Sequence, residues 1–216
     1  SGELAIAENG TYDVNNYARE NVNVASSGGS DLDSYIDGSL TEITSNATSI
    51  RNYAFYYCSN LTSANFPNAT NIGNNVFYGC SNLISANFPN AKTIGSSMFT
   101  YCRKLTSINF PNAKTINSYS FGYCSSLTKI DVPYATNVEE NAFRECTNLT
   151  NVNLPNATQL ASYAFRTCSL LQSINLPNIT YISGYVFQDC KKLTSVILPN
   201  ITYIDNYGLA FCYSLI

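Results

Sequence analysis

The amino-acid sequence predicts a repeat solenoid built around a parallel β-ladder, because three residue types recur with one fixed period. All eight cysteines are spaced 22 residues apart, from Cys58 to Cys212. All seven prolines have the same spacing, from Pro67 to Pro199, and each cysteine is followed three positions later by leucine. A fixed period of roughly 20–50 residues is typical of repeat proteins whose units stack on one another.

A single 22-residue unit has too little apolar surface to fold alone. Its roughly five large apolar side chains contribute on the order of 8–15 kcal/mol on burial. Fixing the backbone costs roughly 1–2 kcal/mol for each residue, which exceeds that gain. Stacking supplies the missing burial, so we expect each position to lie over its counterpart one turn earlier.

Positions counted from each cysteine predict the elements of one turn in order. Apolar residues at +6 and +8 predict a short inward-facing strand, which ends at the proline at +9 because proline lacks the N–H that a ladder needs. Asn at +10, replaced once by Tyr134, predicts a turn. A second short extended piece ends at the apolar residue at +14. Phe at +19, three residues before the next cysteine, predicts one helical or 3₁₀ turn.

The two ends of the chain differ from the repeats. Residues 1–25 predict a small β-rich module, since Asn9-Gly10 lies between alternating apolar residues as in a tight hairpin. Residues 26–38 are rich in Ser and Gly, which is typical of a flexible linker. The solenoid itself is expected over residues 39–216, with 39–57 as a capping turn that lacks Cys and Pro. The last repeat is unfinished, which leaves three alternatives: a longer native chain, a cap formed by the altered last turn, or two copies that meet end to end.

The repeat pattern resembles a known family. The unit "CTNLTNVNLPNATQLASYAFRT", with its Cys, Leu, Pro-Asn and Phe positions, is similar to the BspA-like (treponemal-type) leucine-rich repeat, and the resemblance covers about residues 40–216. It implies a right-handed leucine-rich-repeat solenoid of the α/β horseshoe type, rich in strands. It also implies a surface protein of a host-associated microbe, with adhesion known for some members. Similar repeats occur in prophage-like proteins, so the resemblance names no ligand.

The charge pattern argues against nucleic acid as a partner. The net charge is −3, and only 12% of the residues are charged. Residues 43–130 contain six bases and no acid, but these bases are spread over many repeats instead of clustering on one element. No apolar run is long enough to span a membrane, so we expect no membrane insertion.

The cysteines have a structural explanation. Equivalent residues one turn apart lie within the Cα distance of a disulfide, yet stacked side chains point in parallel, whereas a disulfide needs a specific dihedral angle. We therefore expect a reduced, buried ladder in which each cysteine acts as a small apolar residue. No C-x-x-C pair exists and the chain has no His, which argues against metal. The ladder comprises Cys58, Cys80, Cys102, Cys124, Cys146, Cys168, Cys190 and Cys212.

The sequence indicates a protein that is not an enzyme and that needs no cofactor. The absence of His excludes Ser-His and Cys-His nucleophilic catalysis. Glu139, Glu140 and Glu145 are close in sequence, but acids on the outside of one repeat are expected to be solvated. No glycine-rich phosphate loop is present.

Two groups of polar or aromatic positions are candidates for a binding surface. The first is tyrosine, since exposed tyrosines that stack from turn to turn offer rigid amphipathic contact area, although such stacking also serves stability alone. The second is the polar face of the first strand, at +4, +5 and +7. The tyrosine candidates are Tyr119, Tyr163, Tyr181, Tyr185, Tyr203 and Tyr207. The strand candidates are Thr106, Ser107, Asn109, Thr128, Lys129, Asp131, Thr150, Asn151 and Asn153.

The predicted function is that of a surface-displayed or secreted binding or adhesion module for a host or microbial protein or a glycan. It would act by shape and hydrogen bonding, without catalysis. The alternative is a structural or spacer component of a phage-tail-like or cell-wall assembly, with the first 25 residues as the attachment. Self-association through the C-terminal edge is a further possible partner interaction.

Overall fold

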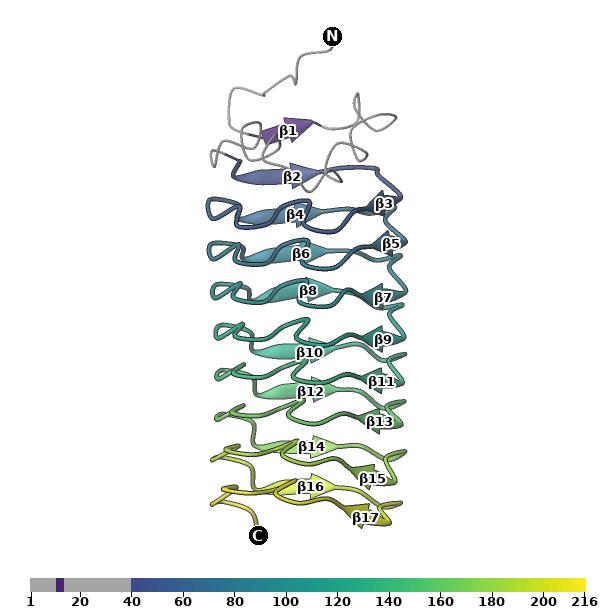
Figure 1. Cartoon of the computed structure of the whole chain (residues 1–216), viewed down its shortest axis with the longest axis vertical. Helices are drawn as coiled ribbons and strands as arrows, with labels where there is room; N and C mark the ends of the chain where they lie inside the picture. Colours follow the sequence, from purple (N-terminus) through teal and green to yellow (C-terminus); the bar gives the residue numbers. More distant parts are fainter. Residues whose placement is uncertain (1–10, 14–39) are drawn as a thin grey trace.

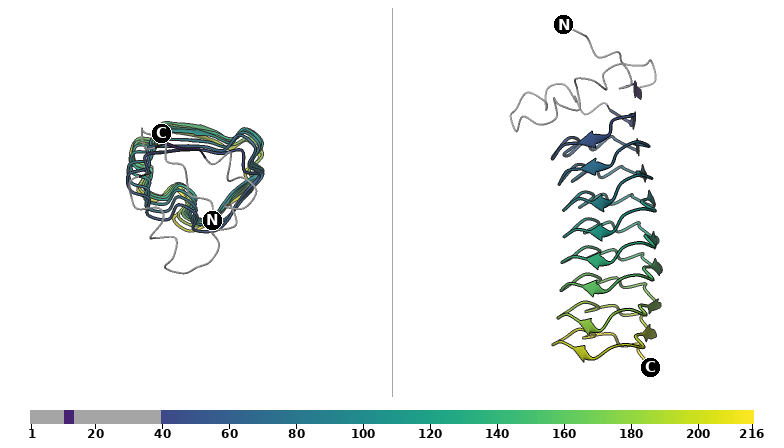
Figure 2. Two further views of the ribbon diagram at one scale, coloured as in Figure 1. Left: turned by 90° about the horizontal axis from the view of Figure 1, so that it is seen from above. Right: turned by 90° about the vertical axis from the view of Figure 1, so that its right-hand side faces the viewer.

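The computed structural model describes residues 11–13 and 40–216, and the fold is stated for these residues. They form a straight stack of similar turns, with β2 (Glu42–Thr44) near one end and β17 (Tyr203–Ile204) at the other (Figure 1). Viewed along the stack, the turns superimpose on one closed outline (Figure 2). The prediction of a parallel-strand solenoid is confirmed.

The first ladder consists of three-residue strands at +5 to +7. Paired strands run parallel with equal registers, so that Ser85 faces Ser107 and Ala86 faces Ile108, and the pairing is interrupted between the strands at 107–109 and 129–131 and between those at 151–153 and 173–175. The β2–β4 register is one residue shorter, since Glu42 faces Ser63. The strands are β1 (Thr11–Asp13), β2 (Glu42–Thr44), β4 (Ser63–Asn65), β6 (Ser85–Asn87), β8 (Ser107–Asn109), β10 (Lys129–Asp131), β12 (Asn151–Asn153), β14 (Ser173–Asn175) and β16 (Ser195–Ile197).

The second ladder consists of two-residue strands at +13 and +14, as the short extended piece predicted. Its inward residue is the apolar one, for example Ile94, which pairs with Ile116 and has no exposed surface. The strands are β3 (Ser49–Ile50), β5 (Asn71–Ile72), β7 (Thr93–Ile94), β9 (Thr115–Ile116), β11 (Asn137–Val138), β13 (Gln159–Leu160), β15 (Tyr181–Ile182) and β17 (Tyr203–Ile204).

The third side of each turn, +17 to +21, is also bonded from turn to turn. The N–H groups of Tyr119, Phe121 and Tyr123 donate to the carbonyls of Glu140, Ala142 and Arg144, at 3.0, 2.8 and 2.7 Å respectively. Residues at +17 and +21 have positive φ in every turn, for example 56° at Tyr119 and 62° at Tyr123.

The predicted helical turn on this side is therefore wrong for the described residues. A single turn-like hydrogen bond does join Phe to the next cysteine, as from Cys124 N–H to Phe121 O at 3.1 Å. Left-handed residues on both sides of the phenylalanine prevent this turn from extending into a right-handed helix. The backbone satisfies its remaining groups with the neighbouring turns instead.

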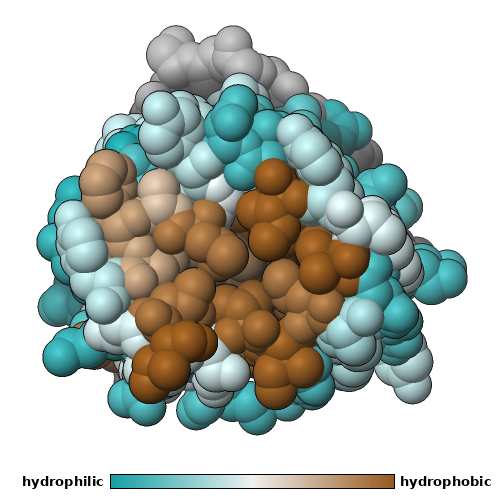
Figure 3. Space-filling model, turned by 90° about the horizontal axis from the view of Figure 1, so that it is seen from below, coloured by the Kyte–Doolittle hydropathy of each residue, from teal (hydrophilic) through white to brown (hydrophobic). Residues whose placement is uncertain are grey.

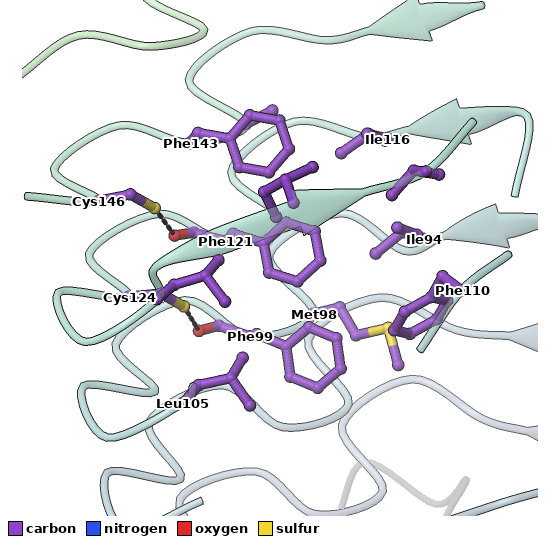
Figure 4. Close-up of a cluster of buried hydrophobic side chains, with 14 of the residues drawn as sticks. Ile94, Met98, Phe99, Leu105, Phe110, Ile116, Phe121, Cys124, Phe143 and Cys146 are labelled. Atoms are coloured by element: carbon purple, nitrogen blue, oxygen red, sulfur yellow. Dashed lines mark hydrogen bonds between the residues drawn. The ribbon is translucent and has the colours of Figure 1, made fainter. Parts of the chain in front are cut away.

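The core is built from columns of identical side chains, as the repeat predicted. Phe99, Phe121 and Phe143 stack with centroids 5.4 Å apart and rings within 11° of parallel, and none has exposed surface (Figure 4). The leucines at +3 and the residues at +8, +11 and +14 fill the rest of the interior. Because each column continues through the stack, every inner turn is covered on both faces.

The cysteines form one of these columns and are all free thiols, seven of them buried. Each thiol from Cys80 onward donates a hydrogen bond to the carbonyl of a phenylalanine one turn earlier. The Cys124 thiol donates to Phe99 O and the Cys146 thiol to Phe121 O, each at 3.1 Å (Figure 4). The thiol thus satisfies a polar atom inside the core, which a purely apolar side chain would not do.

The C-terminal end of the stack presents apolar residues to solvent, seen as the central brown area in Figure 3. Ile204 and Phe211 are 44% and 48% exposed there. The predicted hairpin at Asn9-Gly10 and the linker at 26–38 lie outside the described residues, apart from β1, which pairs in parallel with β2. The domain boundaries and the predicted end-to-end self-association stay predictions.

Candidate binding surface

The tyrosines predicted at +17 lie on the third side of the stack, and three of them form a column. The rings of Tyr163, Tyr185 and Tyr207 stack in consecutive turns, with centroids 4.9 and 5.0 Å apart and interplanar angles of 10°. Tyr207 is 60% exposed, whereas Tyr163 and Tyr185 are half-buried. Stacked rings cover one another's faces, so the column offers its ring edges and hydroxyl groups to a partner.

Tyr119 lies at the same position but outside this column. Its neighbour in the next turn is Asn141 and not tyrosine, so the two-turn gap to Tyr163 prevents ring stacking. Tyr53, at the equivalent position of the first turn, belongs to another group of aromatic residues.

That second group extends the aromatic surface along the N-terminal half of the stack, and the sequence analysis missed it. Tyr56 stacks on Tyr78 at 5.1 Å, Tyr78 meets Tyr101 edge to face at 5.6 Å, and Tyr101 stacks on Tyr123 at 4.7 Å. These residues occupy +20 and +21, and counting those positions from each cysteine shows the same run in the sequence. The tyrosines at +17, +20 and +21 together form the surface that we call the tyrosine stripe: Tyr53, Tyr56, Tyr57, Tyr78, Tyr101, Tyr119, Tyr123, Tyr163, Tyr185 and Tyr207.

Three arginines pack on the tyrosine stripe. The guanidinium carbon of Arg103 lies 5.7 Å from the ring centroid of Tyr101. The corresponding distances are 5.8 Å for Arg144 over Tyr123 and 5.6 Å for Arg166 over Tyr163. A guanidinium near an aromatic ring is attracted by the ring's quadrupole, so these contacts hold the arginines against the stripe.

Two tyrosines of the stripe, Tyr56 and Tyr78, have a raised pKa. Burial raises the pKa of Tyr56 above its ordinary value, and the nearby Tyr57 and Tyr53 raise it further. Burial also raises the pKa of Tyr78, with Tyr57 and Tyr101 as the next causes. The raised pKa values keep the hydroxyl groups of Tyr56 and Tyr78 protonated, and able to donate hydrogen bonds, at neutral pH.

The remaining predicted tyrosines lie on the second ladder. Tyr181 on β15 and Tyr203 on β17 stack at 5.4 Å, and the Tyr181 hydroxyl donates to Asp205 Oδ2 at 2.8 Å. This hydrogen bond raises the pKa of Tyr181. The pKa of Asp205 is lowered, first by the Asn206 N–H and then by Tyr181. These two tyrosines form a separate pair at +13, four positions before the stripe.

The predicted polar strand face lies on β8, β10 and β12 and is exposed, but its side chains largely bind one another. Asn109 donates to Asn87 Oδ1 at 2.7 Å. Asp131 accepts from Asn153 at 2.8 Å and pairs with Lys129 at 2.9 Å, and these contacts lower the pKa of Asp131.

The threonines of this face bind the backbone of the previous turn. Thr106 donates to Ile84 O and Thr150 to Thr128 O, at 3.3 and 3.1 Å. Because the side chains of Asn109 and Asp131 are also bonded to the neighbouring turn, this face has few hydrogen-bonding groups left for a ligand. Ser107, Thr128, Lys129 and Asn151 share the face and are exposed. The predicted site residues thus lie on three separate segments of the turn: the +17 position, the second ladder and the first strand with the residue before it.

The sequence family follows from the repeats that build this surface. The model of the BspA type leucine-rich repeat region, with six copies, matches residues 35–136 and 114–216. The chain belongs to the BspA type leucine-rich repeat family. No curated protein matches it significantly.

Solved structures of bacterial leucine-rich repeat proteins share the fold. A leucine-rich repeat protein of T. pallidum matches with a TM-score of 0.61 and 22% identity over 79% of this chain and 72% of its own. A leucine-rich cell surface protein of Faecalibacterium prausnitzii gives 0.53 and 22%, over 82% and 66%. A leucine-rich repeat protein from Eubacterium ventriosum gives 0.55 and 26%, over 79% and 42%. The chain therefore spans less than two thirds of the last two.

Two other kinds of site are absent from the described residues. No group of three or more His, Cys, Asp or Glu residues among them is arranged to hold a metal ion. Within residues 40–216, no helix has the length and apolar character of a membrane span.

Proposed function

We propose that this BspA type solenoid is a non-catalytic binding module, displayed at a cell surface or secreted, which recognises a protein or a glycan through the tyrosine stripe. The observation that carries the proposal is the stacked column of Tyr163, Tyr185 and Tyr207. Their rings already hold one another in place by stacking, so these side chains lose little conformational freedom when a partner binds. Tyrosine is also among the residue types enriched at interfaces.

The other candidate surfaces support this choice by contrast. The polar strand face has its Asn109 and Asp131 groups bonded within the ladder, and a partner would have to replace those hydrogen bonds. The stripe offers hydroxyl groups and ring edges along nearly the whole stack. The surface location is proposed by analogy with the Faecalibacterium prausnitzii neighbour, whose description names the cell surface.

The experiment is a binding screen against arrays of extracellular proteins and glycans, with a triple variant as the probe of the site. Tyr163→Asn, Tyr185→Asn and Tyr207→Asn remove the rings but keep the backbone conformation, because Asn occupies the same left-handed position at Asn75 and Asn141. The matched control is Tyr134→Asn, an exposed tyrosine that lies away from the stripe.

The expected result is at least one ligand whose binding falls about tenfold or more in the triple variant and is unchanged in the control. A ligand that binds both variants equally well would place the binding surface elsewhere. Silence on all arrays would favour the alternative role, that of a spacer, which the straight, continuously hydrogen-bonded stack also suits (Figure 1).

A further inference from the structure

Two arginines at the same position of adjacent turns pack on the tyrosine stripe. Arg144 and Arg166 both occupy +20, and their backbones are joined because Glu145 N–H donates to Arg166 O at 2.9 Å. Neighbouring turns are about 4.8 Å apart. Arg144 packs over Tyr123 and Arg166 over Tyr163, so the pair fills the gap between the two groups of stacked rings.

This pair of positive charges has no anionic partner in the described part of the chain. Within residues 40–216 the one ion pair is Lys129–Asp131, and Glu145 pairs with neither arginine. The Nε atoms of both arginines are buried without a hydrogen-bond partner. Arg144 makes a single long side-chain hydrogen bond, from Nη1 to Asn141 Oδ1 at 3.4 Å.

Two positive charges on the same stripe, in adjacent turns and without an acidic partner, together attract an anion to this part of the surface. The buried Nε atoms are closed to an incoming ligand, so the terminal Nη groups are the ones to meet it. Guanidinium groups bind carboxylate and sulfate oxygens by paired hydrogen bonds, and the tyrosine contacts fix their position in advance.

We propose that Arg144 and Arg166 form an oxyanion site for the carboxylate or sulfate groups of a linear acidic glycan that lies along the tyrosine stripe. The proposal rests on the proposed function and adds the chemical class of the ligand. Arg103, over Tyr101, supplies a further positive charge on the same stripe. A polymer whose acid groups recur along its length can reach several of these charges at once.

The ring geometry favours a glycan over a nucleic acid. Single-stranded nucleic acids bind proteins by stacking bases on exposed aromatic faces. In the stripe, Tyr101 and Tyr123 cover each other's faces, as do Tyr163 and Tyr185. Hydroxyl groups beside guanidinium groups match the mixed hydroxyl and acid groups of an acidic sugar chain.

The test measures binding of the full chain to five polymers. Polygalacturonate carries carboxylates, dextran sulfate carries sulfates, and unmodified dextran is the neutral control. Polyglutamate and oligo-dT represent acidic peptides and nucleic acids. The double variant Arg144→Gln/Arg166→Gln removes the site, and Lys191→Gln/Lys192→Gln removes the same charge from two adjacent exposed lysines elsewhere. A third variant, Arg144→Lys/Arg166→Lys, keeps the charge and loses the planar guanidinium.

We expect polygalacturonate or dextran sulfate to bind, with a Kd that rises about tenfold or more in the arginine-to-glutamine variant and less than about twofold in the lysine control. The arginine-to-lysine variant should retain only part of the affinity, which separates guanidinium recognition from net charge. Unchanged thermal unfolding in each variant confirms that the fold is intact. Should the glutamine variant unfold, the lysine variant decides the question by itself.

Several results would overturn the site. These are equal losses in both glutamine variants, stronger binding of polyglutamate or oligo-dT than of the acidic glycans, and no binding of any acidic glycan. Failure of the proposed function is distinguishable from these. If an array ligand depends on Tyr163, Tyr185 and Tyr207 but not on the arginines, the binding module stands and the anion site does not.

Discussion

The Asn156 side chain donates a hydrogen bond from Nδ2 to the Pro133 carbonyl at 2.8 Å, across the boundary between two turns. Asn178 makes the same bond to Pro155, and the asparagines at +10 repeat it elsewhere in the stack. Tyr134 replaces asparagine at this position and is 58% exposed. Tyrosine has no amide N–H₂ group to donate, so this turn lacks the side-chain bond to Pro111.

Tyr134→Asn should therefore stabilise the protein. Restoring the bond to Pro111 O is expected to raise the free energy of unfolding by about 0.5–1.5 kcal/mol, the usual net value of one hydrogen bond. Urea denaturation followed by circular dichroism measures the change. Asn156→Ala should lower stability by a similar amount, and a gain in that variant would contradict the explanation.

Thr167 should be a source of backbone strain. It has φ of 61°, a conformation that β-branched residues rarely adopt, whereas the equivalent Gly79 adopts it without a Cβ penalty. Thr167→Asn is expected to raise the free energy of unfolding by about 1 kcal/mol, because asparagine tolerates the left-handed region. Differential scanning calorimetry checks this as a higher Tm. Thr180→Asn, at a position with ordinary φ, should bring no comparable gain.

The phenylalanine column should be sensitive to a gap. Phe143 has no exposed surface and stacks on Phe121 and Phe165 at 5.4 and 5.0 Å. Phe143→Ala is expected to cost about 3–5 kcal/mol, since the neighbouring turns cannot close the cavity. Phe143→Leu should cost about 1.5 kcal/mol or less, because leucine fills most of the space and stands at the equivalent Leu209. Equal losses in the two variants would mean that the column does not act as a packed unit.

The buried thiols should make the protein unfold steeply at alkaline pH. Burial raises the pKa of Cys102, Cys124 and Cys146, so the folded state keeps these protons after the unfolded chain has lost them. Their contribution is complete below the unfolded thiol pKa of about 8.5 and is lost as the pH rises above it. Each thiol adds a slope of about −1.4 kcal/mol per pH unit in that range.

Urea denaturation at several pH values between 8 and 11 measures this slope. In Cys102→Ala the slope of the unfolding free energy against pH should be shallower by about 1.4 kcal/mol per pH unit, the contribution of one thiol, whatever the variant's stability at pH 7. An unchanged slope would show that this thiol is not protected by the fold. Titration with a thiol reagent gives an independent check, since the native protein should react first at the half-buried Cys212.

The sequence predicted the stack because its period is carried by residues that must be buried. Leu105, Phe110 and Ile116 lie inside as their positions required, and the prolines end the first strands. The third side was predicted incorrectly. Its conformation depends on left-handed residues such as Tyr119 and Glu145, and neither residue type signals that conformation in a sequence, as glycine would.

The candidate surface was predicted only in part, for a related reason. Counting at +17 found Tyr163, Tyr185 and Tyr207, whose stacking follows from the period alone. The contact of Arg144 with Tyr123 joins residues 21 apart, one less than the period, so aligning the repeats does not place them together. Such contacts depend on side-chain direction, which requires the folded turn.

On the third side, alternate N–H groups of one turn donate to carbonyls of the next, and within residues 40–216 no backbone bond there reaches beyond an adjacent turn. Each 22-residue repeat is thus an equivalent unit of the stack. In-frame duplication or deletion of one repeat's codons would lengthen or shorten the solenoid while the remaining repeats keep the same hydrogen bonds to their neighbours. A lineage can in this way change how far the protein extends without redesigning its interior.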